Sequence, residues 1–249
     1  RERAWEQGAV KTALITGGAS GLGRVHALRL ADEGYAVAIL DVNEAGLRET
    51  ASQSPRIHRY ACDVTDLAKV QQTVSTVIEA HGPVDRLINC AAIMPGGLLL
   101  DHSAEQISRI MEINYVGMVN VCQTVVPAMV ARDEGEVILY GSTAGVIPMQ
   151  RFGAYGASKA ANNFYARLLI AENRSKVRMT LVFPPSVNTP LLDQAADGPP
   201  ILNTRFGRRF LTVEPEGVVA AAERAVRRGR KSCFPGILPR IIVMASWFA

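Results

Sequence analysis

The chain has 249 residues, of which 48% are hydrophobic and 20% are charged, and its formal net charge is +4. This composition is typical of a globular protein with a sizeable core, and the small excess of basic residues disfavours a nucleic-acid partner. The four cysteines and four histidines show neither CxxC nor HExxH spacing. We therefore expect no disulfide framework, no bound metal, and a cytoplasmic protein with reduced thiols.

Short apolar runs alternate with helical patterns along most of the chain. The predicted strands are 12–16, 36–41, 57–64, 84–92, 135–142 and 177–185. The predicted helices run from the first glycine-rich turn to about residue 34, and over 43–53, 67–82, 104–131 and about 153–173. Because the strands lack an alternation of period two, helices should cover both of their faces. The order predicts an α/β fold: a single Rossmann-like domain over 1–249, with a doubly wound parallel sheet flanked by helices.

A glycine-rich turn, TGGASGLG (16–23), connects the first predicted strand to the first predicted helix. Glycine is needed where the backbone turns sharply or approaches a ligand without a Cβ atom. The helix that follows directs free N–H groups and the positive end of its dipole at the same point, which suits a pyrophosphate. Gly17, Gly21 and Gly23 therefore predict a dinucleotide-binding site.

Asp41 ends the second predicted strand. A carboxylate at this place can accept hydrogen bonds from the adenosine ribose, and it repels the 2′-phosphate of NADP. Val42, Asn43, Ala19 and Ser20 supply no compensating cation, so NAD is favoured over NADP as the cofactor. Asp41 could also serve as the N-cap of the next helix.

Two later segments have weak periodicity. Residues at about 186–212 are rich in Gly and Pro, and we expect a mobile substrate loop with a short helical piece there. The apolar end, 235–249, is shorter than the roughly 20 residues that span a bilayer. It could pack on the core, form a subunit contact, line the substrate mouth or lie on a membrane surface. The charged start, RERAWEQGAV, is unlike a signal peptide.

Seven motifs in this order resemble those of the short-chain dehydrogenase/reductase family. They are TGGASGLG (16–23), Asp63 with Val64, NCAA (89–92), Asn114, Ser142, YGASK (155–159) and PPSVNTP (184–190). The resemblance covers about Thr12 to Phe234. It implies an oxidoreductase acting on a CH–OH group, with a catalytic tetrad of Asn114, Ser142, Tyr155 and Lys159.

The chemistry of these four residues can be stated. Tyr155 and Lys159 are four residues apart, so they lie on one helical face, and the ammonium should lower the pKa of the phenol toward neutrality. The resemblance implies that Lys159 also holds the nicotinamide ribose and that Ser142 donates a hydrogen bond to the substrate oxygen. Asn114 would anchor a water that links Lys159 to solvent, or would satisfy backbone groups at a helix irregularity.

The resemblance also implies which residues contact the cofactor. They are Gly17, Ser20, Gly21, Leu22, Gly23, Asp41, Val42, Asp63, Val64, Asn89, Ala91, Tyr155, Lys159, Pro184, Val187 and Thr189. Three residues depart from the family pattern: Cys90, Ala92 and Pro185. Pro185 has no N–H to offer the carboxamide of the cofactor, whereas Thr189 remains available to hold it.

The loops expected around the site are apolar. They comprise 93–98, 146–149, Phe152, Leu191 and Leu192. Few charges could clamp an anion, with Arg151 and Arg205 as the exceptions. We therefore expect an apolar, bulky secondary alcohol or ketone as substrate, such as a steroid-, terpenoid- or lipid-like molecule.

Two other functions remain open at this point. One is an NADP-dependent keto-lipid or ketoacyl reductase, and the other is a dinucleotide-sensing protein without turnover. The helices at 104–131 and 153–173 resemble those that pair between subunits in the family, so we expect a homodimer or a homotetramer.

Overall fold

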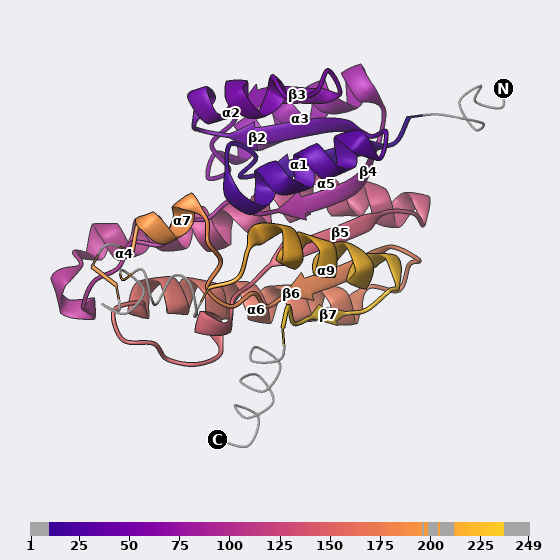
Figure 1. Ribbon diagram of the computed structural model, residues 1–249. Coiled ribbons are helices and arrows are strands. Elements are labelled where there is room, and N and C mark those ends of the chain that lie inside the picture. The colour runs from indigo at the N-terminus through magenta and orange to yellow at the C-terminus, as the bar shows by residue number, and fades with distance from the viewer. Residues whose placement is uncertain (1–9, 196, 199–203, 205–211, 237–249) are drawn as a thin grey trace, which may run out of the picture.

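The computed structural model describes residues 10–195, 197–198, 204 and 212–236. One sheet of seven parallel strands crosses the molecule in the order β3-β2-β1-β4-β5-β6-β7 (Figure 1). Helices lie on both faces of this sheet. The structure therefore confirms the predicted α/β fold with a doubly wound parallel sheet in one domain.

The strands are β1 (Thr12–Thr16), β2 (Ala36–Asp41), β3 (Ile57–Ala61), β4 (Val84–Asn89), β5 (Glu136–Tyr140), β6 (Arg178–Val182) and β7 (Ser232–Cys233). β1 and β5 are buried along their whole length. Their sequences, TALIT and EVILY, are rich in apolar residues on both sides of the pleat, as expected where helices cover both faces.

The helices are α1 (Gly21–Asp32), α2 (Glu44–Ala51), α3 (Leu67–His81), α4 (Ala104–Met111), α5 (Gly117–Arg132), α6 (Gly153–Glu172), α7 (Pro190–Asp193) and α9 (Pro215–Arg227). On one face, Leu30 of α1 and Val218 of α9 share a core cluster with Ile39 of β2. On the other face, α3, α5 and α6 pack on the sheet and form a second core cluster, to which Val121 and Ala166 belong. The sheet thus lies between two apolar cores.

The long helix predicted at 104–131 is present but interrupted. It begins with a capping box in which Ser103 and Gln106 bond each other's backbone N–H groups. A π-helical turn over Glu112–Val116 then separates α4 from α5. Within the described residues, the stretch Ala104–Arg132 is the one helix long and apolar enough to cross a membrane, and half of its apolar window is buried. Because α5 packs in the core cluster, its apolar character is explained by the fold.

Two elements near the end of the described residues, α9 and β7, were not predicted from the sequence. α9 has buried Val218, Ala222 and Val226 at intervals of four residues, a helical pattern that could have predicted it. β7 has two residues, which is too short to give a pattern, and it pairs with Leu181 and Val182 of β6.

Part of the expected substrate loop is described. It contains α7 and a bridge between Val187 and Val213. Residues 196, 199–203 and 205–211 of this loop lie outside the described residues, and so do 237–249 of the apolar C-terminal segment.

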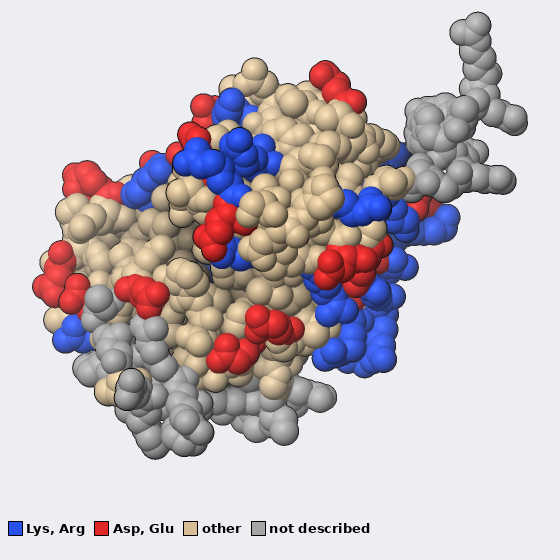
Figure 2. Space-filling view, turned by 45° about the horizontal axis from the view of Figure 1, so that its top comes forward, with Lys and Arg blue, Asp and Glu red and all other residues tan. Residues whose placement is uncertain are grey.

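The strand order reverses beside β1, since β2 and β3 lie on one side of it and β4 to β7 on the other. Ligands bind at such a switch point, outside the carboxyl ends of the strands. The glycine turn follows β1 and the NCAA stretch follows β4, so both predicted cofactor segments lie there. On the face shown in Figure 2, Lys and Arg side chains gather in one group at the right edge and a second at the upper left, and uncharged residues form most of the surface between them.

Candidate active site

The glycine turn has a backbone that side chains would disrupt. Gly17 has a φ of 70°, and a Cβ atom there would lie 2.9 Å from the backbone nitrogen of Ala91. A Cβ atom on Gly23 would collide with the carbonyl oxygen of Gly17. Both positions therefore require glycine, and they let the turn pack closely against the end of β4.

The N-terminus of α1 faces a groove that can receive a dinucleotide. The Ser20 side chain makes no capping hydrogen bond, and the first turn of α1 contains no acidic residue. Gly21, Leu22 and Gly23 line the groove, so the free N–H groups of this turn and the positive end of the helix dipole are directed at it. This arrangement suits a pyrophosphate, and the residues present therefore fit an NAD-type cofactor.

Asp41 lies in the same groove at the end of β2. Its carboxylate accepts hydrogen bonds from the N–H groups of Ala19 (3.1 Å) and Asn43 (3.0 Å). The N-cap of α2 is Asn43, whose side chain accepts from the N–H of Gly46 at 3.0 Å. The alternative that Asp41 caps this helix is therefore wrong, and its carboxylate faces the groove instead.

Asp63 lines the groove beside Arg109. The Asp63 carboxylate accepts from the N–H and the hydroxyl of Thr65 at 2.9 and 2.8 Å, and from the Arg109 guanidinium at 3.2 Å. Burial acts to raise the pKa of Asp63, but the Thr65 and Arg109 hydrogen bonds prevail and lower it. Among the described residues that line the groove, Arg109 is the one cation, and no sequence motif had pointed to it.

The structure brings most of the predicted cofactor residues together. Gly17, Ser20, Gly21, Leu22, Gly23, Asp41, Val42, Asp63, Val64, Ala91 and Thr189 line the groove. Tyr155, Lys159, Pro184 and Val187 line a second cavity beside it. Asn89 lines neither; it is 2% exposed and accepts a hydrogen bond of 3.0 Å from the Thr16 hydroxyl, so it joins β4 to β1.

The groove and the second cavity meet at a junction that five residues line. These are Leu22, Cys90, Ala92, Thr189 and Leu191. Two of the departures from the family pattern, Cys90 and Ala92, are among them. Burial raises the pKa of the Cys90 thiol well above its usual range, so the thiol is protonated and behaves as a small apolar group.

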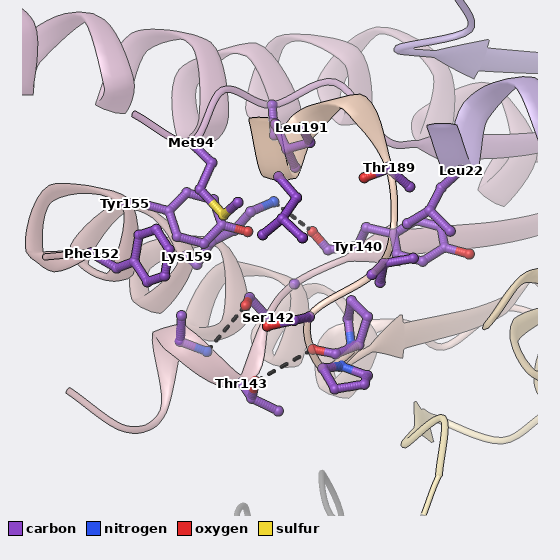
Figure 3. A pocket seen from close by; sticks show the side chains of 18 of the residues that line it. Leu22, Met94, Tyr140, Ser142, Thr143, Phe152, Tyr155, Lys159, Thr189 and Leu191 are labelled. Atoms are coloured by element: carbon purple, nitrogen blue, oxygen red, sulfur yellow. Dashed lines mark hydrogen bonds between the residues drawn. The ribbon is translucent and has the colours of Figure 1, made fainter. Parts of the chain in front are cut away.

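Tyr155 and Lys159 lie one turn apart on α6 and line the second cavity (Figure 3). Both are buried. The Lys159 Nζ atom donates a hydrogen bond of 3.0 Å to the carbonyl oxygen of Tyr140 and lies 5.8 Å from the centroid of the Tyr155 ring. The spacing of four residues thus places the phenol and the ammonium in one cavity, as the sequence predicted.

The prediction that Lys159 lowers the pKa of Tyr155 is wrong for this structure. Burial raises the pKa of Tyr155 to about 12, although a hydrogen bond with Ser142 acts to lower it. Burial lowers the pKa of Lys159 to about 8, with an opposing contribution from Cys90. Removal from water therefore dominates both pKa values, and the ammonium is directed at the Tyr140 carbonyl.

Ser142 follows β5 and is held by a residue that the sequence reading missed. The Asn163 side chain accepts from the Ser142 N–H at 3.3 Å and donates to the Ser142 carbonyl at 3.0 Å. The Ser142 hydroxyl lines the cavity and accepts from the N–H of Ala144 at 3.1 Å. Asn163 lies four residues after Lys159, so its place on the same helical face was the available signal.

Asn114 lies in the π-helical turn and is fully buried. Its side chain accepts from the Ile93 N–H at 2.8 Å and donates to the Ile93 carbonyl and the Ser158 hydroxyl, both at 2.9 Å. One of the two predicted roles, a buried Asn that satisfies backbone groups at a helix irregularity, is therefore confirmed. π-Helical turns occur frequently at functional sites.

The second cavity is largely apolar, and Thr143 and Ser186 add polar side chains to its lining. Of the loop residues predicted around the substrate, Met94, Met149, Phe152, Leu191 and Leu192 line it. Arg151 is not among the lining residues, and its guanidinium donates to the Asp197 carbonyl at 3.1 Å. Arg205 lies outside the described residues.

Comparison with known proteins places this chain and its fold in one family. The family model of the short chain dehydrogenases matches residues 11–199. The chain therefore belongs to the short-chain dehydrogenase/reductase family, whose members are oxidoreductases. The predicted family assignment is thus confirmed.

Two curated relatives cover part of the chain. A probable oxidoreductase, EphD of Mycobacterium tuberculosis, is 34% identical over 181 residues, which are 70% of this chain and 31% of that protein. The 2-keto-3-deoxy-L-fuconate dehydrogenase of Xanthomonas campestris is 34% identical over 187 residues, 74% of this chain and 61% of that enzyme. The chain thus spans about a third of the first relative's length and less than two thirds of the second's.

Two solved structures resemble the whole fold. A short-chain dehydrogenase/reductase from Burkholderia phymatum in complex with NAD has a TM-score of 0.85 at 25% identity, covering 95% of this chain and 92% of that one. A variant of actinorhodin polyketide ketoreductase with NADPH has a TM-score of 0.82 at 26% identity, covering 90% and 95%. Similar folds thus bind either cofactor.

Proposed function

We propose that this chain is an NAD(H)-dependent oxidoreductase that interconverts a secondary alcohol and a ketone on an apolar, bulky substrate of steroid-, terpenoid- or lipid-like chemistry. One observation carries the proposal. Tyr155, Ser142 and Lys159 lie in a largely apolar cavity that meets the dinucleotide groove at a shared junction. A substrate in this cavity would have its polar end at the two hydroxyl groups and its apolar body against Met94, Phe152 and their neighbours.

The nicotinamide cofactor, when bound, supplies or accepts the hydride. Tyr155 would donate a proton to the ketone oxygen, or accept one from the alcohol, since its phenol is the acid at the cavity wall. In this structure its pKa is raised to about 12, so the neutral, proton-donating form is present at pH 7. Ser142 would donate a hydrogen bond to the same substrate oxygen, where negative charge develops.

Lys159 supplies the positive charge. With a pKa of about 8, it is mostly protonated at neutral pH. Although burial keeps the pKa of the resting phenol raised, a positive charge one turn away would stabilise the negative charge that develops on the phenol oxygen as the proton leaves it. Asn163 fixes the Ser142 backbone, and Asn114 fixes the Ile93 backbone at the wall of the groove.

Asp41 supports NAD over NADP. Its carboxylate is at the groove end of β2 and is bonded to backbone N–H groups only. A 2′-phosphate placed near this carboxylate would be repelled, and the described groove residues next to it, Val42 and Asn43, carry no positive charge. The remaining candidate is an NADP-dependent keto-lipid or ketoacyl reductase, which the fold similarity to the NADPH-bound polyketide ketoreductase favours.

The test is a turnover assay that follows absorbance of the reduced nicotinamide. Apolar secondary alcohols and ketones, including steroid and terpenoid compounds, are compared with small anionic carbonyl compounds, each with NAD(H) and NADP(H). We expect turnover of the apolar compounds with NAD(H). Preference for small anions would contradict the substrate class, and preference for NADP(H) would favour the ketoacyl-type reductase. Absence of turnover across the panel in both wild type and Tyr155→Phe would favour a dinucleotide-sensing protein.

We further propose a homodimer or homotetramer in the cytoplasm. Phe164 and Leu168 lie four residues apart on α6 and are 67% and 45% exposed. Two large apolar side chains on one helical face suit a subunit contact. The four cysteines are free, which suits a reducing compartment.

A further inference from the structure

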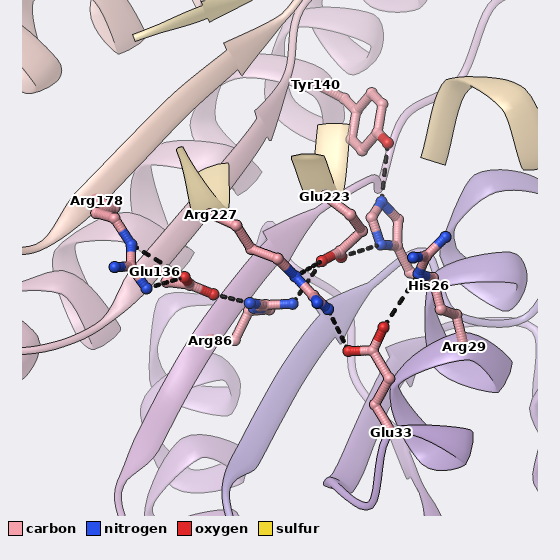
Figure 4. A network of polar contacts seen from close by, with 9 residues as sticks. All are labelled: His26, Arg29, Glu33, Arg86, Glu136, Tyr140, Arg178, Glu223 and Arg227. Atoms are coloured by element: carbon pink, nitrogen blue, oxygen red, sulfur yellow. Dashed lines mark hydrogen bonds and ion pairs between the residues drawn. The ribbon is translucent and has the colours of Figure 1, made fainter. Parts of the chain in front are cut away.

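A chain of buried polar side chains leads away from the floor of the active-site cavity (Figure 4). The Tyr140 hydroxyl lies 2.8 Å from Nε2 of His26, and Nδ1 of His26 lies 3.0 Å from a carboxylate oxygen of Glu223. The other oxygen of Glu223 accepts from the Arg86 guanidinium at 2.5 Å. All four side chains are at most 3% exposed. None of them belongs to the motifs that carry the proposed reaction.

The hydrogen bonds fix one arrangement of protons. The Glu223 carboxylate can only accept, so Nδ1 of His26 carries the proton and Nε2 accepts from the Tyr140 hydroxyl. Burial lowers the pKa of His26, although Glu223 acts to raise it, and burial raises the pKa of Tyr140 well above 10. For Glu223, burial acts to raise the pKa, but His26 and Arg86 prevail and lower it. At neutral pH the phenol and the imidazole are therefore neutral and the carboxylate is charged.

The network places several polar groups in the interior of the protein. Removing a carboxylate, an imidazole and a phenol from water is unfavourable unless every group is bonded, and well-packed apolar residues often replace such networks without loss of stability. The network joins four elements: His26 is on α1, Glu223 on α9, Arg86 on β4 and Tyr140 on β5. It thus ties the helix of the glycine turn to the strand that precedes Ser142.

The network ends at the group that holds Lys159. Tyr140 lines the cavity with its ring, and its hydroxyl is directed away from Tyr155 (Figure 3). The carbonyl oxygen of the same residue accepts the hydrogen bond from Lys159 at 3.0 Å. Among the described residues this is the one hydrogen bond that the ammonium makes. The main chain of Tyr140 is paired with Val182 of β6, so the sheet fixes this carbonyl and the buried network lies directly behind it.

We propose that Tyr140 is a positioning residue for Lys159 and that His26 and Glu223 hold Tyr140 in place. The sheet fixes the carbonyl itself, and the buried network packs the Tyr140 ring at the cavity floor and keeps water away from the ammonium. This inference rests on the proposed function only in that Lys159 is taken to serve the reaction. Tyr155 from α6 and the Cys90 thiol after β4 are the other titratable groups that face Lys159.

The test measures the titration of Lys159 directly, by NMR of protein with ¹³C-labelled lysine, in which Lys159→Met assigns the signal. In Tyr140→Phe the phenol is lost and His26 loses its donor. We expect water to reach the ammonium more easily, so that the midpoint of Lys159 rises by about one pH unit or more toward that of an exposed lysine. His26→Leu should raise the Lys159 midpoint in the same way. The double variant should raise this midpoint little further, because both changes break one network.

The chain offers a matched control. The Tyr60 hydroxyl lies 3.0 Å from Nε2 of His81, a bond of the same kind on β3 and α3. Tyr60→Phe should leave the Lys159 midpoint unchanged. If Tyr140→Phe does not fold, Glu223→Gln replaces it in the test. This variant keeps the Tyr140 and His26 side chains, and it should also raise the Lys159 midpoint.

Two results would overturn the inference. One is an unchanged or lower Lys159 midpoint in folded Tyr140→Phe, His26→Leu or Glu223→Gln, even where these variants are less stable, since that would show a purely structural network. The other is an equal rise in Tyr60→Phe. Turnover is not needed for this readout. An inactive wild type would contradict the proposed function, whereas the titration would still decide the role of Tyr140.

Discussion

The Lys159 ammonium donates a hydrogen bond of 3.0 Å to the main-chain oxygen of Tyr140 and is thereby held at the cavity wall beside Tyr155. The two residues come from different elements, β5 and α6, and the bond is buried. An ammonium fixed in this way acts on a phenol one helical turn away without forming a direct ion pair.

Loss of the Tyr155 hydroxyl should remove the proton donor and leave the cavity intact. We expect Tyr155→Phe to lower kcat by about 10²–10⁴-fold, because general acid–base catalysis contributes on that order, while the Kd for NAD changes little. Tyr165→Phe is the matched control, since Tyr165 is on the same helix and its hydroxyl bonds Gln123. Equal losses in both variants would contradict the assignment.

Asp41 should set the choice of cofactor. In Asp41→Ser the repulsion of a 2′-phosphate is lost, so the preference for NAD over NADP, measured as the ratio of Kd values by calorimetry, should fall about ten-fold or more. Asp63→Asn is the control, because Asp63 also lines the groove. Asp63→Asn should weaken the binding of NAD and of NADP to a similar degree. A ratio that stays constant in Asp41→Ser would show that another residue discriminates.

The glycine turn should not tolerate a side chain. Gly23→Ala places a Cβ atom against the Gly17 carbonyl, so we expect NAD binding to be lost. Gly217 in α9 has no atom within 4 Å of a built Cβ, and Gly217→Ala should instead raise the free energy of unfolding by roughly 0.5–1 kcal/mol. Calorimetry for binding and urea unfolding for stability check the pair. Normal NAD affinity in Gly23→Ala would contradict the close packing described here.

The buried ammonium should give stability a particular pH dependence. Burial lowers the pKa of Lys159 in the folded chain to about 8 from its usual 10.5. The unfolded chain therefore binds more protons between these pH values, so stability from this residue rises as the pH rises through this window. Between pH 7 and 10.5 the free energy of unfolding of wild type should therefore rise, relative to that of Lys159→Met, by on the order of 3 kcal/mol.

Urea unfolding across this pH window measures the difference. Lys69→Met, at an exposed position on α3, is the control, and its stability relative to wild type should stay constant. If the free energies of unfolding of wild type and Lys159→Met change with pH in parallel, Lys159 titrates as an exposed lysine does.

The apolar face of α6 should mediate subunit contact. A carboxylate in place of Phe164 would have to be buried in an interface, so Phe164→Glu should shift the chain toward monomer in sedimentation velocity. Leu100→Glu is the control, since Leu100 is 99% exposed and lies outside α5 and α6. An unchanged sedimentation coefficient in Phe164→Glu would place the interface elsewhere.

Local patterns predicted much of the fold because each carries its own physical signal. β1 and β2 begin and end at the residues that their apolar runs marked, since helices bury both faces. The glycine turn was predictable because Gly17 and Gly23 are required by backbone geometry. β7 was missed because it has two residues and is defined by its pairing with β6.

The site was less predictable wherever tertiary packing decides. The spacing of Tyr155 and Lys159 placed them in one cavity, but their pKa values depend on burial, which the spacing does not report. The link from Tyr140 through His26 to Glu223 joins residues up to 197 positions apart, so no motif could have revealed it. Asn163 could have been found from its interval of four after Lys159.

A crystal structure of the chain with NAD and an apolar secondary alcohol that it oxidises tests the account most directly. We predict that the Tyr155 hydroxyl lies about 2.6–3.2 Å from the alcohol oxygen, with the Ser142 hydroxyl at a similar distance. A productive complex in which the alcohol oxygen contacts neither hydroxyl would contradict the proposed role of this cavity.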